Sequence, residues 1–126
     1  EIGLPWCVFL DSDLGDPFQH KTNLKRKQEV EGLGRPFYST RKREIENYLC
    51  PDLILHEAGV AVNFTNICDA KQIIGDAVGM KPDDVSDRFW PRMSAEQILQ
   101  RSMYQDGDKQ RSELKELIEN LLALVH

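Results

Sequence analysis

A short apolar run that ends in two aspartates constrains this chain more than any other feature. Cys7 to Leu10 are apolar and rich in β-forming residues, and Asp11-Ser12-Asp13 follows directly. The run is too short for a helix, so it predicts a buried strand over residues 6–10. Side chains two positions apart on an extended backbone point to the same side. We therefore expect both carboxylates at the carboxyl end of this strand, where open α/β sheets bind their ligands.

Two adjacent carboxylates repel each other unless a positive charge joins them. A divalent cation that prefers oxygen ligands, Mg²⁺ or Mn²⁺, would provide that charge. In the alternative interpretation, Asp11 only caps a helix or turn, and Asp13 to Asp16 form a polar turn, because Asp and Gly are common turn residues. The pattern alone leaves both interpretations open.

Length and composition indicate one soluble globular domain over residues 1–126. The chain is 40% hydrophobic and 29% charged, which is ordinary for a globular protein. It has neither an apolar stretch long enough to span a membrane nor a signal-peptide pattern. Its three cysteines form no CxxC motif, so we expect reduced thiols and a cytoplasmic protein. The chain begins with Glu1 and a strand follows almost at once, which suggests a piece of a longer protein.

Positive charge is concentrated directly after the aspartate pair. The net charge is −5, but the segment from Lys21 to Glu44 has eight basic and three acidic residues, a local charge of +5. Metal-binding carboxylates beside a basic, phosphate-attracting segment are the charge layout of a phosphoryl-transfer site. A solvated basic face without a ligand would explain the same residues.

The remaining sequence predicts a second strand and several helices. A β-rich run over residues 35–39 should pair with the first strand, because the two runs are separated by a crossover-length segment. Between them we expect a polar loop over residues 13–23 and a short helix over residues 24–30. Further helical segments are expected at 41–49, 52–58, 66–78, 94–105 and 110–125, with a turn at 106–108.

The last of these helices has the clearest apolar stripe of the chain. Its spacing of three and four residues predicts a face that packs on the core. The residues of this stripe are Leu114, Leu117, Ile118, Leu121, Leu122 and Val125.

Two glutamates form a second candidate group. On a helix, Glu44 and Glu46 would point about 200° apart, so only one of them could face a metal held by Asp11 and Asp13. Alternatively, both are exposed and offset the charge of Arg41-Lys42-Arg43 through helical ion pairs. Spacing alone does not decide between these arrangements.

The order of these features resembles the TOPRIM domain of OLD-family nucleases. The similarity covers about residues 5–58 and, more loosely, the closing helix, and it is carried by Asp11-Ser12-Asp13, the basic segment, the second strand and Arg41-Lys-Arg-Glu-Ile-Glu-Asn-Tyr-Leu49. The family comprises ATP-dependent endonucleases of phage and bacterial defence that join an ATPase to a TOPRIM nuclease. The resemblance implies an α/β fold, the C-terminal part of a TOPRIM-like (Rossmannoid) parallel sheet with a helical insertion, rich in helix.

The resemblance also implies a function and a set of site residues. The expected activity is metal-dependent cleavage of DNA with Mg²⁺ or Mn²⁺, in partnership with an ATPase domain of the same parent chain; a homodimer stays open. By position, the metal carboxylates are Asp11 and Asp13, with Glu46 or Glu44 as the further acid, and Lys109 is the candidate for the family's late basic residue. The residues expected to hold nucleic acid are Lys21, Lys25, Arg26 and Lys27. The family's glutamate on an earlier strand has no counterpart, so the isolated fragment is expected to be weak or inactive.

Two other function classes fit parts of the pattern. In a haloacid-dehalogenase-like phosphatase, Asp11 would be the nucleophile and Asp13 the general acid, and Gly75-Asp76 would match that family's later motif. However, Asp13-Leu14-Gly15 lacks the usual Gly-Thr continuation, and Gly75-Asp76 falls within a predicted helix. In a non-catalytic interaction domain, the carboxylates would serve only as caps.

Overall fold

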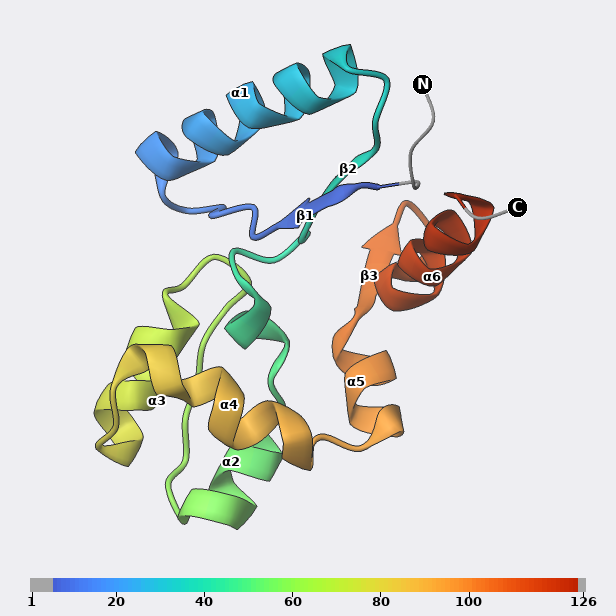
Figure 1. The fold of residues 1–126 in the computed structure, drawn as a ribbon. Coiled ribbons are helices and arrows are strands. Elements are labelled where there is room, and N and C mark those ends of the chain that lie inside the picture. Colours follow the sequence, from blue (N-terminus) through green and yellow to red (C-terminus); the bar gives the residue numbers. More distant parts are fainter. Residues whose placement is uncertain (1–5, 125–126) are drawn as a thin grey trace.

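The structure, a computed structural model, describes residues 6–124 and combines short strands with many helices. Figure 1 shows three parts: a β1–α1–β2 unit, a group of helices around α2, α3 and α4, and an arm formed by α5, the β3–β4 hairpin and α6. The first part contains β1 (Val8–Leu10), α1 (Pro17–Gly32) and β2 (Phe37–Ser39). The second contains the 3₁₀ turn η1 (Ile45–Tyr48), α2 (Pro51–Ala58), α3 (Ala70–Val78), η2 (Pro82–Asp84), α4 (Val85–Phe89) and η3 (Trp90–Arg92). The arm contains α5 (Ala95–Arg101), β3 (Met103–Asp106), β4 (Lys109–Ser112) and α6 (Glu113–Leu124).

The two predicted strands pair in parallel. Val8 lies opposite Phe37 and Leu10 opposite Ser39, which confirms that the two β-rich runs share one sheet. Parallel neighbours require a crossover connection, and α1 provides it. The strands are shorter than the runs of residues 6–10 and 35–39, but the mixed α/β, helix-rich class is as expected.

Helix α1 corrects the prediction of a loop over residues 13–23 and a short helix over residues 24–30. The helix begins at Pro17, because the Asp16 side chain caps it by accepting a hydrogen bond from the Gln19 amide at 3.1 Å. Proline at the start of a helix loses no hydrogen bond, since that amide has no partner within the helix. Most of α1 is exposed, and Asn23 is its buried residue.

The predicted helix over residues 41–49 is also wrong. Only Ile45–Tyr48 form a helical turn, of the 3₁₀ type, and Glu44 occupies its N-cap position. The preceding residues bend instead, because their backbone groups bind other segments of the chain. The Arg43 amide donates to the Asn66 carbonyl at 2.7 Å, and the Arg43 carbonyl accepts from the Asp13 amide at 2.7 Å.

The apolar core lies in the second part, among η1, α2, α3 and α4. Its largest fully buried apolar side chains are Leu49, Ile54, Ile74, Val85 and Phe89. Helix α3 starts at Ala70 rather than residue 66, because Asp69 caps it. Gly59 and Gly79 end α2 and α3 in the left-handed conformation that glycine adopts without strain. The three cysteines, Cys7, Cys50 and Cys68, are free thiols, as expected.

In the arm, the predicted Ser94 capping box and the predicted turn at 106–108 are confirmed, but the helices and strands around them differ from the prediction. Ser94 and Gln97 cap α5 reciprocally, and α5 ends at Arg101 rather than residue 105. Gly107 adopts a positive φ of 63° in the turn of an antiparallel hairpin. Residues 109–112 therefore form strand β4, and the closing helix starts at Glu113.

Burial of the α6 stripe on the core is not borne out. No residue of α6 is buried, and Ile118 and Leu122 are 48% and 53% exposed. Leu114 and Leu117, near the start of the helix, line a cavity together with Asn120 of the same helix. Val125, the last member of the predicted stripe, lies outside the described residues. None of the helices within residues 6–124 is long and apolar enough to cross a bilayer.

Matched leucine substitutions test where the core lies. Leu49 is fully buried, so Leu49→Ala should lower the free energy of unfolding by about 2–5 kcal/mol. The same change at the exposed Leu122 should cost less than about 1 kcal/mol. Urea denaturation followed by circular dichroism measures both. Equal losses would show that α6 packs on the core after all.

Candidate functional site

The candidate site forms where the carboxyl ends of β1 and β2 meet. Asp11 follows β1, and its Oδ1 accepts a hydrogen bond at 3.1 Å from the Ile45 amide, which follows β2. The Asp13 amide donates to the Arg43 carbonyl at 2.7 Å. The loop after the first strand is thus joined directly to the segment after the second strand.

A small hydroxyl network fixes the distance between these two segments. Ser12 and Thr40 are both buried. The Ser12 amide donates to Thr40 Oγ1 at 3.0 Å, and the two hydroxyls donate to the Lys42 carbonyl at 2.7 and 2.6 Å. Buried polar groups that are fully paired hold one geometry, because breaking the network leaves unsatisfied groups.

Helix α1 supports the aspartate loop from the other side. Asn23 Nδ2 donates to Asp13 Oδ2 and to the Asp11 carbonyl, both at 2.8 Å. Asp13 has a φ of 53°, an unusual left-handed conformation for a non-glycine residue. Gly15 has a φ of 98°, and a Cβ atom there would lie 2.5 Å from the Ile67 carbonyl oxygen. The loop conformation therefore requires glycine at this position.

Both glutamates of the second candidate group are buried. Glu44 and Glu46 are 3% and 7% exposed, so the arrangement with two exposed glutamates is wrong. Glu44 Oε1 accepts from the Lys71 amide at 3.0 Å, and Glu46 Oε2 accepts from Ser86 Oγ at 3.0 Å. Because this segment is not an α-helix, the opposite orientations expected of helical neighbours do not apply.

Burial and mutual repulsion disfavour ionisation of these acids. Burial raises the pKa of Asp11, and Asp13 adds to the rise. Burial likewise raises the pKa of Glu46, with a contribution from Asp11. For Glu44, burial together with the charges of Glu46 and Asp69 raises the pKa to about 7. The negative charge of one acid therefore raises the pKa of a neighbouring acid where the two strands end.

Lys71 is a cation of this site that the sequence analysis missed. Its charge lowers the pKa of Asp11, Glu44 and Glu46, opposing the effect of burial on all three. Its Nζ lies 3.9 Å from Asp83 Oδ1. Lys71 comes from the first turn of α3, far from the acids in sequence, and no local motif marks it.

The carboxylates approach one another without forming a multidentate metal site. Within residues 6–124, no three His, Cys, Asp or Glu side chains are placed to hold one metal ion. Their oxygens are nevertheless the ligand type that Mg²⁺ and Mn²⁺ prefer. Mg²⁺ commonly binds only one or two carboxylates and keeps several waters, so the donor chemistry fits that mode.

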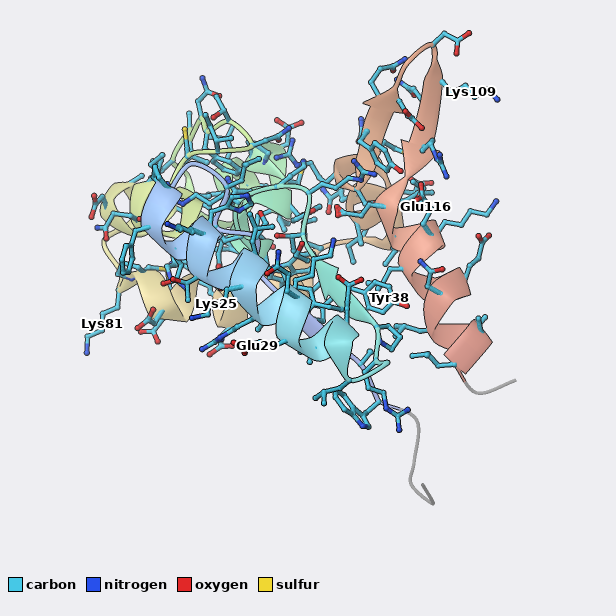
Figure 2. The ribbon with its side chains drawn as sticks, turned by 90° about the horizontal axis from the view of Figure 1, so that it is seen from above. Lys25, Glu29, Tyr38, Lys81, Lys109 and Glu116 are labelled. Carbon is cyan, nitrogen blue, oxygen red and sulfur yellow. The ribbon has the colours of Figure 1, made fainter. Side chains whose placement is uncertain are left out.

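The predicted nucleic-acid residues lie along α1. Lys21, Lys25, Arg26 and Lys27 are all exposed, and Figure 2 labels Lys25 on α1. Relative to Asn23, which touches the aspartate loop, Arg26 and Lys27 lie within about 60° around the helix axis, whereas Lys21 and Lys25 lie about 160° away. Only Arg26 and Lys27 therefore share the side of α1 that faces the acids.

Lys109 is not brought to the carboxylates. It is the first residue of β4, pairs in register with Asp106, and is exposed at the tip of the hairpin. Figure 2 shows it at the far end of the arm. The second motif of the phosphatase alternative is also misplaced: Gly75 packs closely on the Met80 carbonyl, and Asp76 is exposed and bonded to Gln72.

Comparisons with known proteins add no family assignment. No protein-family model matches the chain, and no curated protein or solved structure is similar to it. The resemblance to OLD-family nucleases rests on the quoted residues alone, and the geometry of the site carries the functional proposal.

The raised pKa of Glu44 predicts a pH dependence of stability. The folded protein holds the Glu44 proton more tightly than the unfolded chain does, so ionisation of Glu44 opposes folding. Its contribution is greatest below the ordinary glutamate pKa and is lost as pH rises through about 7. Glu44→Gln keeps an oxygen for the Lys71 amide but cannot ionise.

Glu44→Gln should therefore stabilise the protein at about pH 8 and change little at about pH 5. Urea unfolding at both pH values measures the difference. Glu29→Gln, on the exposed surface of α1, is the matched control and should show no such pH-dependent gain. An equal effect of Glu44→Gln at both pH values would contradict the assignment.

Proposed function

We propose that this chain is the catalytic portion of a metal-dependent DNA endonuclease, belonging to a larger protein that also carries an ATPase domain. One observation supports the proposal above all others. Two parallel strands bring Asp11 and Asp13 to the same sheet edge as the buried Glu44 and Glu46. Acids crowded in this way repel one another, and a divalent cation would offset more of that repulsion than Lys71 does alone.

Asp11, Asp13 and Glu46 are the residues we assign to the metal. The charge of Asp11 raises the pKa of Glu46, whereas Glu44 is bound to the amide of Lys71. Mg²⁺ or Mn²⁺ bound there would supply Lewis-acid stabilisation of a phosphodiester. With so few protein ligands, binding by the isolated chain should be weak.

The other residues would position the acids and the substrate. Asn23 and the Ser12–Thr40 network hold the aspartate loop in place. Lys71, rather than Lys109, is the cation near the acids and would offset negative charge on the phosphate. Arg26 and Lys27 would contact the nucleic-acid backbone, which supplies affinity rather than sequence specificity.

The alternatives receive less support. The phosphatase needs its Gly-Asp motif at the site, and Asp76 instead lies exposed on α3 with Gln72 as its partner. The interaction-domain alternative explains Asp16, which caps α1, and the bond from Asp11 to the Ile45 amide at the start of η1. It also explains Glu44, which accepts from the Lys71 amide at the start of α3. It does not explain why Glu46 is buried as well.

Metal binding and cleavage provide the direct test. Mn²⁺ titrated into the wild type should give weak heats that Asp11→Asn/Asp13→Asn abolishes, while Asp106→Asn/Asp108→Asn in the exposed hairpin leaves them unchanged.

In the full-length parent protein, Asp11→Asn, Asp13→Asn and Glu46→Gln should each slow plasmid nicking by at least about 100-fold. Glu44→Gln should retain more activity than Glu46→Gln.

The two measurements separate errors of detail from failure of the proposal. If Glu46→Gln nicks normally and Glu44→Gln does not, the choice of glutamate is wrong. If folded Asp11→Asn and Asp13→Asn proteins both nick normally, the nuclease proposal itself fails.

The basic residues of α1 predict a change in salt dependence. In the full-length protein, Arg26→Gln/Lys27→Gln should weaken DNA binding and lower its salt slope by up to about two phosphate contacts. Lys21→Gln/Lys25→Gln removes the same charge from the opposite side of α1 and should have a smaller effect. Fluorescence anisotropy with a labelled duplex over a salt series measures both. A larger effect of the second pair would show that DNA follows the other face of the helix.

A further inference from the structure

A second charged group, distinct from the acids, lies on the other side of the segment that follows β2. Arg41, Lys42 and Arg101 carry positive charge, and none of them forms a salt bridge in the described part of the chain. Burial first, and then the charge of Arg101, lower the pKa of Lys42 to about 8. The Glu113 carboxylate acts in the opposite direction on the pKa of Lys42. Cations held together in this way favour the binding of an anion.

Arg41 and Lys42 line a polar cavity of about 400 Å³. The cavity also presents Asn66 and Gln105, whose amides are hydrogen-bond donors. The Arg41 guanidinium lies 3.6 Å from the centre of the Tyr104 ring, and Lys42 Nζ lies 5.0 Å from the centre of the Tyr48 ring. These contacts hold both cationic groups at the wall of the cavity.

An apolar cavity of about 400 Å³ adjoins the polar one. The two share Arg41, Tyr48, Ser102 and Glu113 in their walls. Aromatic side chains from separate elements line the apolar cavity, namely Phe9, Tyr38 and Trp90. Figure 2 labels Tyr38 of β2 and Glu116 of α6, two residues of this cavity that come from different parts of the chain. The indole Nε1 of Trp90 is buried and has no hydrogen-bond partner within residues 6–124.

Glu113, the carboxylate shared by both cavities, is already engaged. It accepts a hydrogen bond from the Tyr48 hydroxyl, and its Oε1 lies 3.2 Å from the Arg41 amide. One acid therefore faces the two cations that line the polar cavity, and Arg101 adds further positive charge. Glu116, a second acid in the wall of the apolar cavity, is bound by the Tyr104 hydroxyl and by Arg111, which offsets its charge. The positive charge of Arg41, Lys42 and Arg101 then suits a dianionic phosphate better than a singly charged carboxylate.

We propose that these joined cavities bind a nucleoside monophosphate unit, with its phosphate on Arg41 and Lys42 and its base in the aromatic cavity. A flat ring fits walls made by Phe9, Tyr38 and Trp90, because aromatic faces stack on bases of any sequence.

The site does not depend on the proposed nuclease activity, but it is adjacent to the acids. Ile45 lines the apolar cavity with its side chain, and its amide binds Asp11. A strand whose last nucleotide occupied the cavities would thus pass close to the carboxylates. In that case the substrate class is a nucleic acid with an unpaired nucleotide.

Tryptophan fluorescence tests the proposal directly. The chain has two tryptophans, so Trp6→Phe leaves Trp90 as the single reporter within the cavity. In this background, thymidine monophosphate should change the Trp90 emission saturably, and thymidine and inorganic phosphate should each bind at least about tenfold more weakly. Adding Arg41→Gln/Lys42→Met should weaken thymidine monophosphate binding at least about tenfold. Lys81→Gln/Arg88→Gln removes two exposed charges elsewhere and should leave binding unchanged.

Three results would overturn the assignment. One is unchanged affinity for thymidine monophosphate in the folded Arg41→Gln/Lys42→Met protein. Another is thymidine binding as tightly as its monophosphate, which would remove the role of the cations. The third is displacement of the nucleotide by decanoate at equal affinity, which would make the ligand an amphipathic acid of another class. Loss of metal binding in Asp11→Asn/Asp13→Asn leaves these results unaffected, so the two proposals fail separately.

Discussion

The parallel pairing of β1 and β2 is the constraint on which the candidate chemistry depends. Three residues on each side make the pairing, which is little on its own, since a two-stranded sheet has marginal stability in water. The polar links beyond the strands complete it. The Ser12 and Thr40 hydroxyls share the Lys42 carbonyl, and Asn23 ties α1 to the aspartate loop. These bonds set the position of Asp11 relative to Ile45, and hence relative to Glu46.

The sequence predicted features that depend on local chemistry. The two strands, the Ser94 capping box, the turn at Gly107 and the end of α3 at Gly79 all follow from residues within a few positions of each other. The start of α1 was missed for a different reason. The helix lacks an apolar face, so periodicity does not reveal it, and the Asp16-Pro17 start signal is the remaining indication.

Features that depend on distant contacts were not predictable in the same way. Residues 41–44 have the composition of a helix, yet bonds to Asn66 and Asp13 bend them, and this change buries both Glu44 and Glu46. Lys71 lies near the acids because α3 packs beside η1. No sequence pattern near Lys71 predicts this contact. The α6 stripe shows the converse case: periodicity identifies an apolar face, but it does not supply an element that covers the face.

Gly15 has a consequence for how this protein can vary. It carries no functional group, yet its positive φ and its approach to the Ile67 carbonyl leave no space for a side chain. Any replacement would push the aspartate loop away from the 65–68 segment, and Asp13 would move with it. In a library of random substitutions, tolerance at Gly15 should therefore resemble that of a catalytic residue. A survey of such a library would identify Gly15 as essential although it takes part in no chemistry.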